Sequence, residues 1–307
     1  RVHLSRRLVR DIACSRERAA QAFRTVADSV ATYAGVQTHL GKLRAWCSGG
    51  GAAPADLAAL GPNVWTADLP AERNGILVLG IPIGTSEFIQ AHGAERMAEE
   101  RILLEQIPKL PDTQCAWLIL QLSAVPRANH LLRTVPPSQV QAYAQTHDTE
   151  VWNTLNKLLG TEEEAADDTD REDRYRRNLA TLPPRLGGLG LKSAERTSTA
   201  AYWAGWVDAL GVLKDKRPGL ARQLLEELDK PTEAQPPCLR EASTARSLLI
   251  ARGYRAPPTW REAANGTVAP QPQNAEAGEF PHGWQFHAAS ALERDYRNRV
   301  VLPLATL

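Results

Sequence analysis

GILVLGIPIG, residues 75–84, is the clearest β-strand pattern in this sequence. The run is short, apolar and rich in β-branched residues, and it is interrupted at Gly80 and Pro82, which a central strand tolerates poorly. We therefore expect a hairpin or a bent strand at this position. Two further short strands are predicted around Gly41, so that the β structure forms a small antiparallel element near residues 36–46 and 75–84.

On both sides of these stretches the pattern is helical, because apolar residues recur three and four positions apart. Gly35 is expected to end the first helix and Ser193 to cap a later one, while Pro126 is expected to break the helical pattern. The predicted fold class is therefore mainly α, or α+β with a small β element. The main helical patterns cover residues 15–34, 86–107, 112–135, 137–159, 193–210, 217–229, 239–254 and 286–301.

The composition is that of an ordinary globular protein. The 307 residues are 43% hydrophobic and 23% charged, with a formal net charge of +1, so no global basic field indicates a nucleic-acid partner. Residues 1–44 are locally basic, with nine lysines and arginines against three acids. The chain opens with Arg1 rather than Met, and we expect it to be part of a longer protein.

The sequence also indicates a compartment. The four cysteines are far apart and include no CxxC pair, which suits a reducing environment. The first residues lack the apolar segment of a signal peptide, and no apolar run is long enough for a membrane span. We expect an intracellular protein, cytoplasmic or nuclear, with no membrane partner.

The spacing of the reactive residues identifies no catalytic or metal site. The sequence has no GxSxG, HExxH, Walker A or GxGxxG pattern, and its seven histidines lack the spacing of metal ligands. Asp167 and Asp168 are adjacent, but they lie in a run of acids without a β pattern. Two-metal chemistry needs carboxylates on a rigid support, so we interpret this pair as solvated charge.

Four stretches, taken in order, resemble segments of one enzyme family. Residues 33–46 (YAGVQTHLGKLRAW) resemble a G-x-x-L-N-x-x-K-T segment, and residues 76–84 (ILVLGIPIG) resemble a Y-L-G-x-P-x-G strand. Residues 182–191 (LPPRLGGLGL) are similar to an L-P-x-x-x-G-G-L-G-L signature, and residues 200–206 (AAYWAGW) continue it as a helix. The family is the reverse transcriptases of non-LTR (LINE-type) retrotransposons, and the resemblance covers roughly residues 15–210.

The resemblance implies a domain organisation and an activity. Residues 1–84 would be the end of the polymerase palm, residues 85–230 a helical thumb-like bundle, and residues 231–307 a Pro- and Gly-rich connection with a helical extension. The family enzyme is an RNA-directed DNA polymerase, a nucleotidyltransferase that uses Mg²⁺ and deoxynucleotides on an RNA/DNA primer-template duplex.

This chain departs from the family where catalysis takes place. A Tyr-x-Asp-Asp hairpin that binds the metal should precede the first helix, yet residues 4–15 hold only Asp11 among several arginines. The first catalytic aspartate and the fingers would lie further upstream, in an N-terminal palm and fingers portion that is missing here. We therefore expect no intact catalytic residue, no metal and no cofactor in this chain, and no polymerase activity from it alone.

Two groups of residues are candidates by resemblance. Lys42 matches the family lysine near the nucleotide phosphates, but without a palm active site it is better explained as an exposed lysine at the start of a strand. The second group would form a primer grip, since glycine permits close approach to a nucleic-acid backbone; the alternative is a simple hairpin. Its members are Leu79, Gly80, Ile81, Pro82, Ile83 and Gly84.

A third group consists of polar residues that could contact phosphate. Arg127, Asn129 and Arg133, with His130, cluster on one side of a predicted helix; the alternative is a plain polar face. Arg185, Gly187 and Gly188 could meet backbone phosphate, or could simply form a turn.

Two other functions of the whole chain stay open. One is a non-catalytic helical module that binds nucleic acid or protein, and the other is a decayed copy without function.

Overall fold

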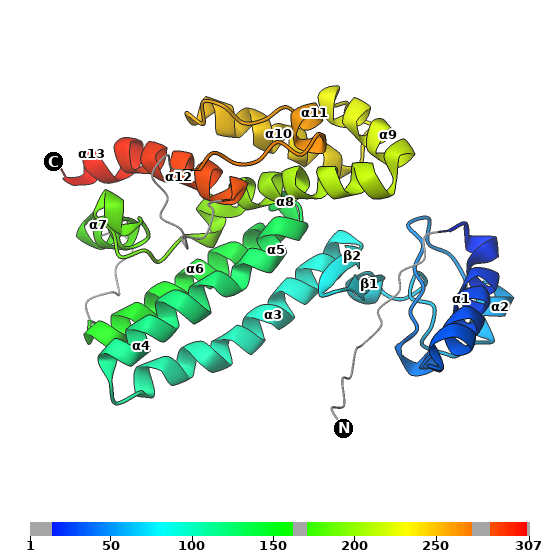
Figure 1. Ribbon diagram of the computed structural model, residues 1–307. Coiled ribbons are helices and arrows are strands. Elements are labelled where there is room, and N and C mark those ends of the chain that lie inside the picture. The colour runs from blue at the N-terminus through cyan, green and yellow to red at the C-terminus, as the bar shows by residue number, and fades with distance from the viewer. Residues whose placement is uncertain (1–13, 162–170, 272–282, 306–307) are drawn as a thin grey trace. The chain divides into compact units, whose positions relative to one another are not determined.

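The computed structural model describes residues 14–161, 171–271 and 283–305. The protein is mainly α-helical with one small antiparallel sheet, which confirms the predicted fold class (Figure 1). The chain divides into two compact units, residues 1–92 and 93–307. Residues 4–13, where the resemblance would place a metal-binding hairpin, and the pair Asp167 and Asp168 lie outside the described residues.

The first unit has a small apolar core. The 3₁₀ turn Arg16–Arg18 leads into α1 (Ala19–Ala34), which ends at Gly35 in the left-handed conformation, as predicted. Short helical turns follow at Leu40–Lys42, α2 (Ala55–Ala58) and Ala71–Arg73. The core of this unit contains Ala20, Leu57, Trp65 and Ala67.

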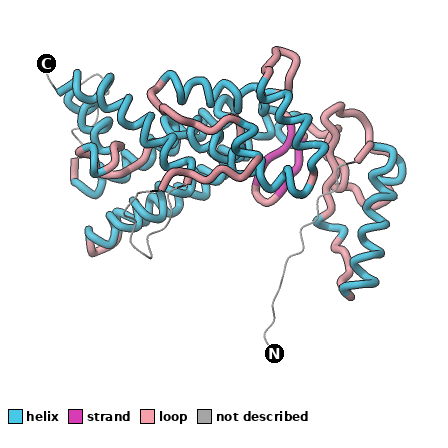
Figure 2. The backbone as a smooth tube through the Cα atoms, turned by 45° about the horizontal axis from the view of Figure 1, so that its top comes forward, coloured by secondary structure: helices cyan, strands magenta, loops and turns pink. Residues whose placement is uncertain are grey.

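The predicted hairpin is present. Strand β1 (Gly75–Val78) pairs antiparallel with β2 (Ile81–Gly84), and these are the strands of the one sheet among the described residues (Figure 2). Leu79 and Gly80 form the two-residue turn with φ of 53° and 81°, both in the region that hairpin turns of this length require. A Cβ on Gly75 would lie 2.2 Å from the Phe88 ring, so this glycine allows Phe88 to pack on the hairpin base.

Residues 36–46 do not form the two short strands predicted around Gly41. Leu40–Lys42 is a 3₁₀ turn, closed by a 3.0 Å bond from the Lys42 amide to the His39 carbonyl. Ala45 instead forms a single parallel bridge with Trp65. The backbone groups of Ala45 pair with Val64 and Thr66, which are too far along the chain for the local pattern to reveal.

Helix α3 (Ser86–Gln106) begins in the first unit and continues into the second, which is helical among its described residues. Asp112 caps α4 (Thr113–Ile119) by accepting a 2.9 Å hydrogen bond from the Cys115 amide. At Pro126, where a break or kink was expected, the helical backbone changes type: a π-helical turn, Leu120–Ala124, and a 3₁₀ turn, Val125–Ala128, lie between α4 and α5 (Asn129–Thr134). Helix α6 (Pro137–Leu159) follows.

Helix α8 (Ala194–Lys216) is the centre of the second unit, and helices α5, α6 and α9–α12 pack against it (Figure 1). Small residues allow this close packing; a Cβ on Gly205 would lie 2.4 Å from the Arg133 carbonyl oxygen. Trp203 is fully buried, with the rings of Tyr254 and Trp284 edge-on to it. The remaining elements are α7 (Arg171–Ala180), a 3₁₀ turn (Pro184–Leu186), α9 (Pro218–Asp229), α10 (Pro237–Ala251), α11 (Trp260–Ala264), α12 (Trp284–Tyr296), a π-helical turn (Arg297–Val301) and α13 (Leu302–Ala305).

The segment beyond residue 231 shares this core. Leu239 and Leu249 of α10, Trp260 of α11 and Trp284 of α12 are buried together with α8. In the part of the chain that the structure describes, no helix has the length and apolarity needed to cross a membrane.

Candidate functional site

The stretch LPPRLGGLGL forms a closed turn between α7 and α8. The amides of Leu189 and Gly190 donate hydrogen bonds of 3.2 and 2.7 Å to the carbonyls of Ala180 and Leu182. Gly187 has φ of 87° with open space around its Cβ position, whereas a Cβ on Gly188 would lie 2.1 Å from the Leu182 carbonyl oxygen. The two glycines therefore serve different purposes, one for backbone conformation and one for close packing.

The turn leads into the capped start of α8. Ser193 accepts a hydrogen bond from the Arg196 amide, so the predicted cap is confirmed. Asp148 of α6 binds the same helix start, accepting bonds of 2.6 Å from both the Ser193 hydroxyl and the Ala194 amide. Burial raises the pKa of Asp148, and these hydrogen bonds oppose that shift. The carboxylate thus fixes α6 to the N-terminus of α8, where a negative charge is favoured.

Arg196 lies in a fixed position beside this cap. Its guanidinium donates bonds of 3.0 and 2.9 Å to the hydroxyl and carbonyl of Thr181. The same group lies over the Tyr296 ring, 4.4 Å from its centroid. The arginine therefore has little rotational freedom.

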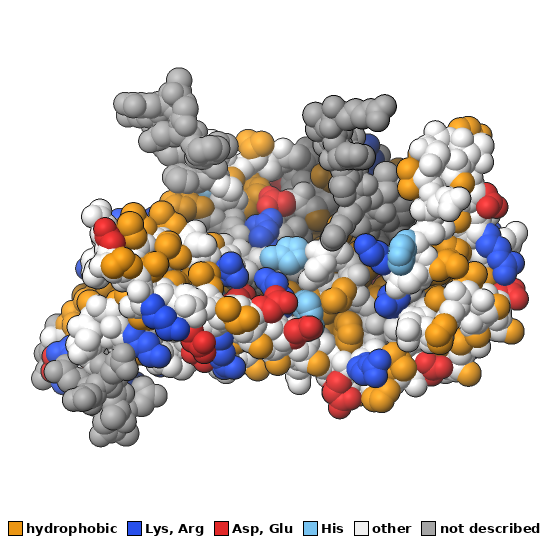
Figure 3. All heavy atoms as spheres, turned by 90° about the horizontal axis from the view of Figure 1, so that it is seen from below, with side chains coloured by type: hydrophobic (Ala, Val, Ile, Leu, Met, Phe, Trp, Pro, Cys, Tyr) orange, Lys and Arg blue, Asp and Glu red, His pale blue; other side chains and the backbone are white. Residues whose placement is uncertain are grey.

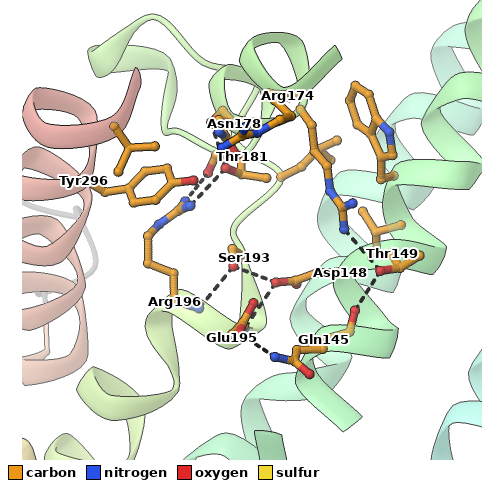
Figure 4. A pocket seen from close by; sticks show the side chains of 16 residues that line it. Gln145, Asp148, Thr149, Arg174, Asn178, Thr181, Ser193, Glu195, Arg196 and Tyr296 are labelled. Atoms are coloured by element: carbon orange, nitrogen blue, oxygen red, sulfur yellow. Dashed lines mark hydrogen bonds between the residues drawn. The ribbon is translucent and has the colours of Figure 1, made fainter. Parts of the chain in front are cut away.

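A pocket of about 470 Å³ opens between α6, α7, α8 and the C-terminal π-helical turn (Figure 4). Arg177 reaches across it and donates a 3.1 Å bond to the Thr149 hydroxyl. Arg174 also lines the pocket, is exposed, and has no hydrogen bond or ion pair with another described residue. The side chains that define the chemistry of the pocket are Arg174, Arg177, Arg196, Glu195, Trp152 and Tyr296.

The structure places two of the predicted phosphate-binding residues in contacts between helices. Arg133 donates to Asp208 of α8 at 2.7 Å and to Gln285 of α12 at 2.9 Å. Asn129 accepts a 3.2 Å bond from the same Gln285. Both side chains thus help to hold α5 against the central helices.

Arg185 is engaged in a similar way. It donates a 2.7 Å bond to Ser290, lies 3.6 Å from the Glu293 carboxylate and covers the Phe286 ring. Together with the positive φ of Gly187 and the close packing of Gly188, this contact explains LPPRLGGLGL as a structural turn. Binding of nucleic acid by these three residues stays a prediction.

The other predicted residues lie at the surface. Arg127 is exposed on the 3₁₀ turn before α5, and Lys42 is exposed on its own 3₁₀ turn. Neither forms an ion pair with a carboxylate of another described residue. In the hairpin, Leu79 and Ile83 are 67% and 41% exposed, whereas Pro82 is buried and Gly80 forms the turn. The apolar hairpin tip is therefore available for a contact.

A buried polar cluster was not predicted from the sequence. The Glu100 carboxylate accepts a 2.7 Å bond from the Tyr143 hydroxyl and lies 2.9 Å from His147 Nδ1. Burial raises the pKa of Glu100, but the bonds to His147 and Tyr143 outweigh it and the net shift is downward. The cluster joins α3 to α6, and its members are too far apart in the sequence for spacing to have paired them.

The described residues contain no group of three or more histidine, cysteine or acidic side chains arranged to hold a metal ion. No protein-family model, curated protein or solved structure matches this chain. The resemblance to reverse transcriptases therefore rests on the four sequence stretches.

Proposed function

We propose that this chain forms the primer-template-holding, thumb-like part of a non-LTR retrotransposon reverse transcriptase and has no polymerase activity alone. The observation that carries the proposal is the β1–β2 hairpin, whose turn exposes Leu79 and Gly80. Only Thr85 separates this hairpin from α3, the first long helix of the helical part. The resemblance implies this order, in which a primer-contacting hairpin is followed by a helical thumb.

The geometry of Leu79 supports a binding role for the hairpin. Leu79 is the one residue other than glycine with positive φ among the described residues, and this conformation costs a leucine about 1 kcal/mol or more. Two-residue turns of this type favour asparagine or glycine at that position. A strained and exposed apolar residue is typical of a functional contact rather than of a turn selected for stability.

Phosphate contacts would be few. On the face shown in Figure 3, basic side chains lie interspersed with acidic and apolar ones rather than in one continuous basic surface. Exposed arginines without a carboxylate partner, such as Arg127, are suited to contact single phosphates. We therefore propose that the hairpin supplies apolar contact to the duplex and that only a few phosphates are bound.

Binding to a primer-template duplex tests this function. About three phosphate contacts imply that the affinity falls about 40-fold when salt rises from about 50 to about 200 mM. Filter binding of the full chain to an RNA/DNA duplex measures this slope, and a primer-extension assay with Mg²⁺ and deoxynucleotides is expected to show no incorporation. No binding at the lower salt concentration would reject the proposal.

Replacement of the strained leucine tests the hairpin itself. Leu79→Asn is expected to stabilise the chain by about 1 kcal/mol, because asparagine accepts the left-handed conformation, and to weaken duplex binding several-fold. Urea denaturation and filter binding measure the two effects. Leu122→Asn is the matched control, because Leu122 is 68% exposed but lies outside the hairpin. Unchanged duplex binding by Leu79→Asn would contradict the role of the hairpin.

A further inference from the structure

The pocket between α6, α7 and α8 concentrates positive charge. Arg174 and Arg177 line it from positions three residues apart on α7, and Arg196 lines it from α8. These three arginines lie outside the motifs that carry the resemblance to reverse transcriptases. A site formed by them is therefore independent of the function proposed above.

The acidic residues of the pocket are already engaged. The Asp148 carboxylate accepts hydrogen bonds from the Ser193 hydroxyl and from the amides of Ala194 and Glu195. The Glu195 carboxylate accepts a 2.7 Å bond from the Gln145 side chain. Asp148 is therefore compensated by the start of α8. Arg196 also lies close enough to the Glu293 carboxylate to interact with it, so Arg174 and Arg177 remain against the single carboxylate of Glu195 in the pocket lining.

The arginines are also positioned in advance. Thr149 holds Arg177, and Thr181 together with the Tyr296 ring holds Arg196. A planar guanidinium that is fixed in this way loses little entropy when it binds a phosphate through two parallel hydrogen bonds. Arg174 is exposed and bonds to no other described residue, and its guanidinium is suited to bind a phosphate.

The rest of the lining suits a planar group attached to the phosphate. Trp152 lines the pocket and is partly exposed, and nucleic-acid bases stack on aromatic rings of this kind. Asn178 and Gln145 supply amide groups that can bind the edge of a base. A volume of about 470 Å³ lies within the range of small-molecule sites.

We propose that this pocket binds a nucleoside monophosphate unit, with the phosphate on Arg174 and Arg177 and the base against Trp152. The unit is either a free mononucleotide or the 5′-phosphorylated end of a nucleic-acid strand, which present the same chemistry.

Calorimetric titration of the full chain tests the site with AMP, adenosine, inorganic phosphate and two tetranucleotides, one of them 5′-phosphorylated. AMP is expected to bind more tightly than adenosine or phosphate. Arg174→Gln is expected to weaken AMP binding about 10-fold or more, since it removes a charge-assisted hydrogen bond. Arg176→Gln is the matched control, because it removes the same charge from α7 at a residue that pairs with Glu172 outside the pocket.

Trp152→Leu distinguishes binding of the base from binding of the phosphate. It is expected to reduce AMP affinity to that of phosphate and to leave phosphate binding unchanged. A preference for the 5′-phosphorylated tetranucleotide over the unphosphorylated one identifies a strand end as the source, and binding of AMP alone identifies a free mononucleotide. Equal binding of adenosine and AMP, equal effects of Arg174→Gln and Arg176→Gln, or no AMP binding at low salt would each overturn the proposal.

Discussion

Gly188→Ala is expected to destabilise the helical unit by about 3 kcal/mol, although Gly187→Ala costs only about 1 kcal/mol. A Cβ on Gly188 would lie 2.1 Å from the Leu182 carbonyl oxygen and 2.4 Å from that of Leu179. Both neighbours are backbone atoms that cannot rotate away, so the turn itself must shift. Gly187 has open space around it and carries only the cost of its positive φ.

Urea denaturation of the two variants measures this difference, and the adjacent positions serve as controls for each other. The transition midpoint of Gly188→Ala is expected to fall well below that of Gly187→Ala, with equal slopes if both variants unfold in two states. Similar midpoints would mean that the turn accommodates a methyl group, and that the close packing of Gly188 does not limit stability.

Glu100→Gln is expected to cost about 3 kcal/mol near neutral pH, because it removes the charge from a buried cluster and leaves its partners without a full acceptor. Glu100 is 2% exposed and accepts hydrogen bonds from Tyr143 and His147. A glutamine has one acceptor oxygen, and its amide group would face a donor. The control is Glu99→Gln on the same helix, since Glu99 is 57% exposed and pairs with Arg96.

The cost of Glu100→Gln should depend on pH. The pKa of Glu100 is lowered in the folded protein from its usual value of 4.5. As the pH falls, Glu100 is therefore protonated in the unfolded chain at a higher pH than in the folded protein. The stabilisation by this carboxylate is therefore complete above about pH 4.5 and is lost as the pH falls through the lowered pKa. Denaturation of both proteins from neutral pH to about pH 3 tests this; a cost that does not change with pH would exclude the carboxylate charge as its source.

Local sequence patterns were sufficient to predict most of the helices and the hairpin. Gly35 ends α1 and Ser193 caps α8 because both act within a few residues of their own backbone. GILVLGIPIG becomes a hairpin because both strands lie in one short stretch. The prediction for residues 36–46 was wrong because Ala45 pairs with Trp65, and a distant partner leaves no trace in local spacing.

The candidate sites were less predictable for the same reason. Arg133 was identified as a polar side chain, but its partner Asp208 lies 75 residues away in the sequence. The pocket is formed by α6, α7 and α8 together. In the sequence alone, the arginines at positions 174 and 177 resemble those of an ordinary solvent-exposed helix surface. Spacing shows which side chains are polar, whereas only the fold shows which of them remain available to a ligand.

The closed turn at residues 182–191 sets a limit on changes in chain length. Its amides donate to carbonyls of the same segment and of Ala180 at the end of α7, and the Ser193 hydroxyl that follows lies 2.6 Å from Asp148. One inserted residue would move Ser193 and the start of α8 away from that carboxylate and would leave a charge buried without its partners. Labels, tags and new termini therefore belong elsewhere, for example in the exposed connection at residues 231–234.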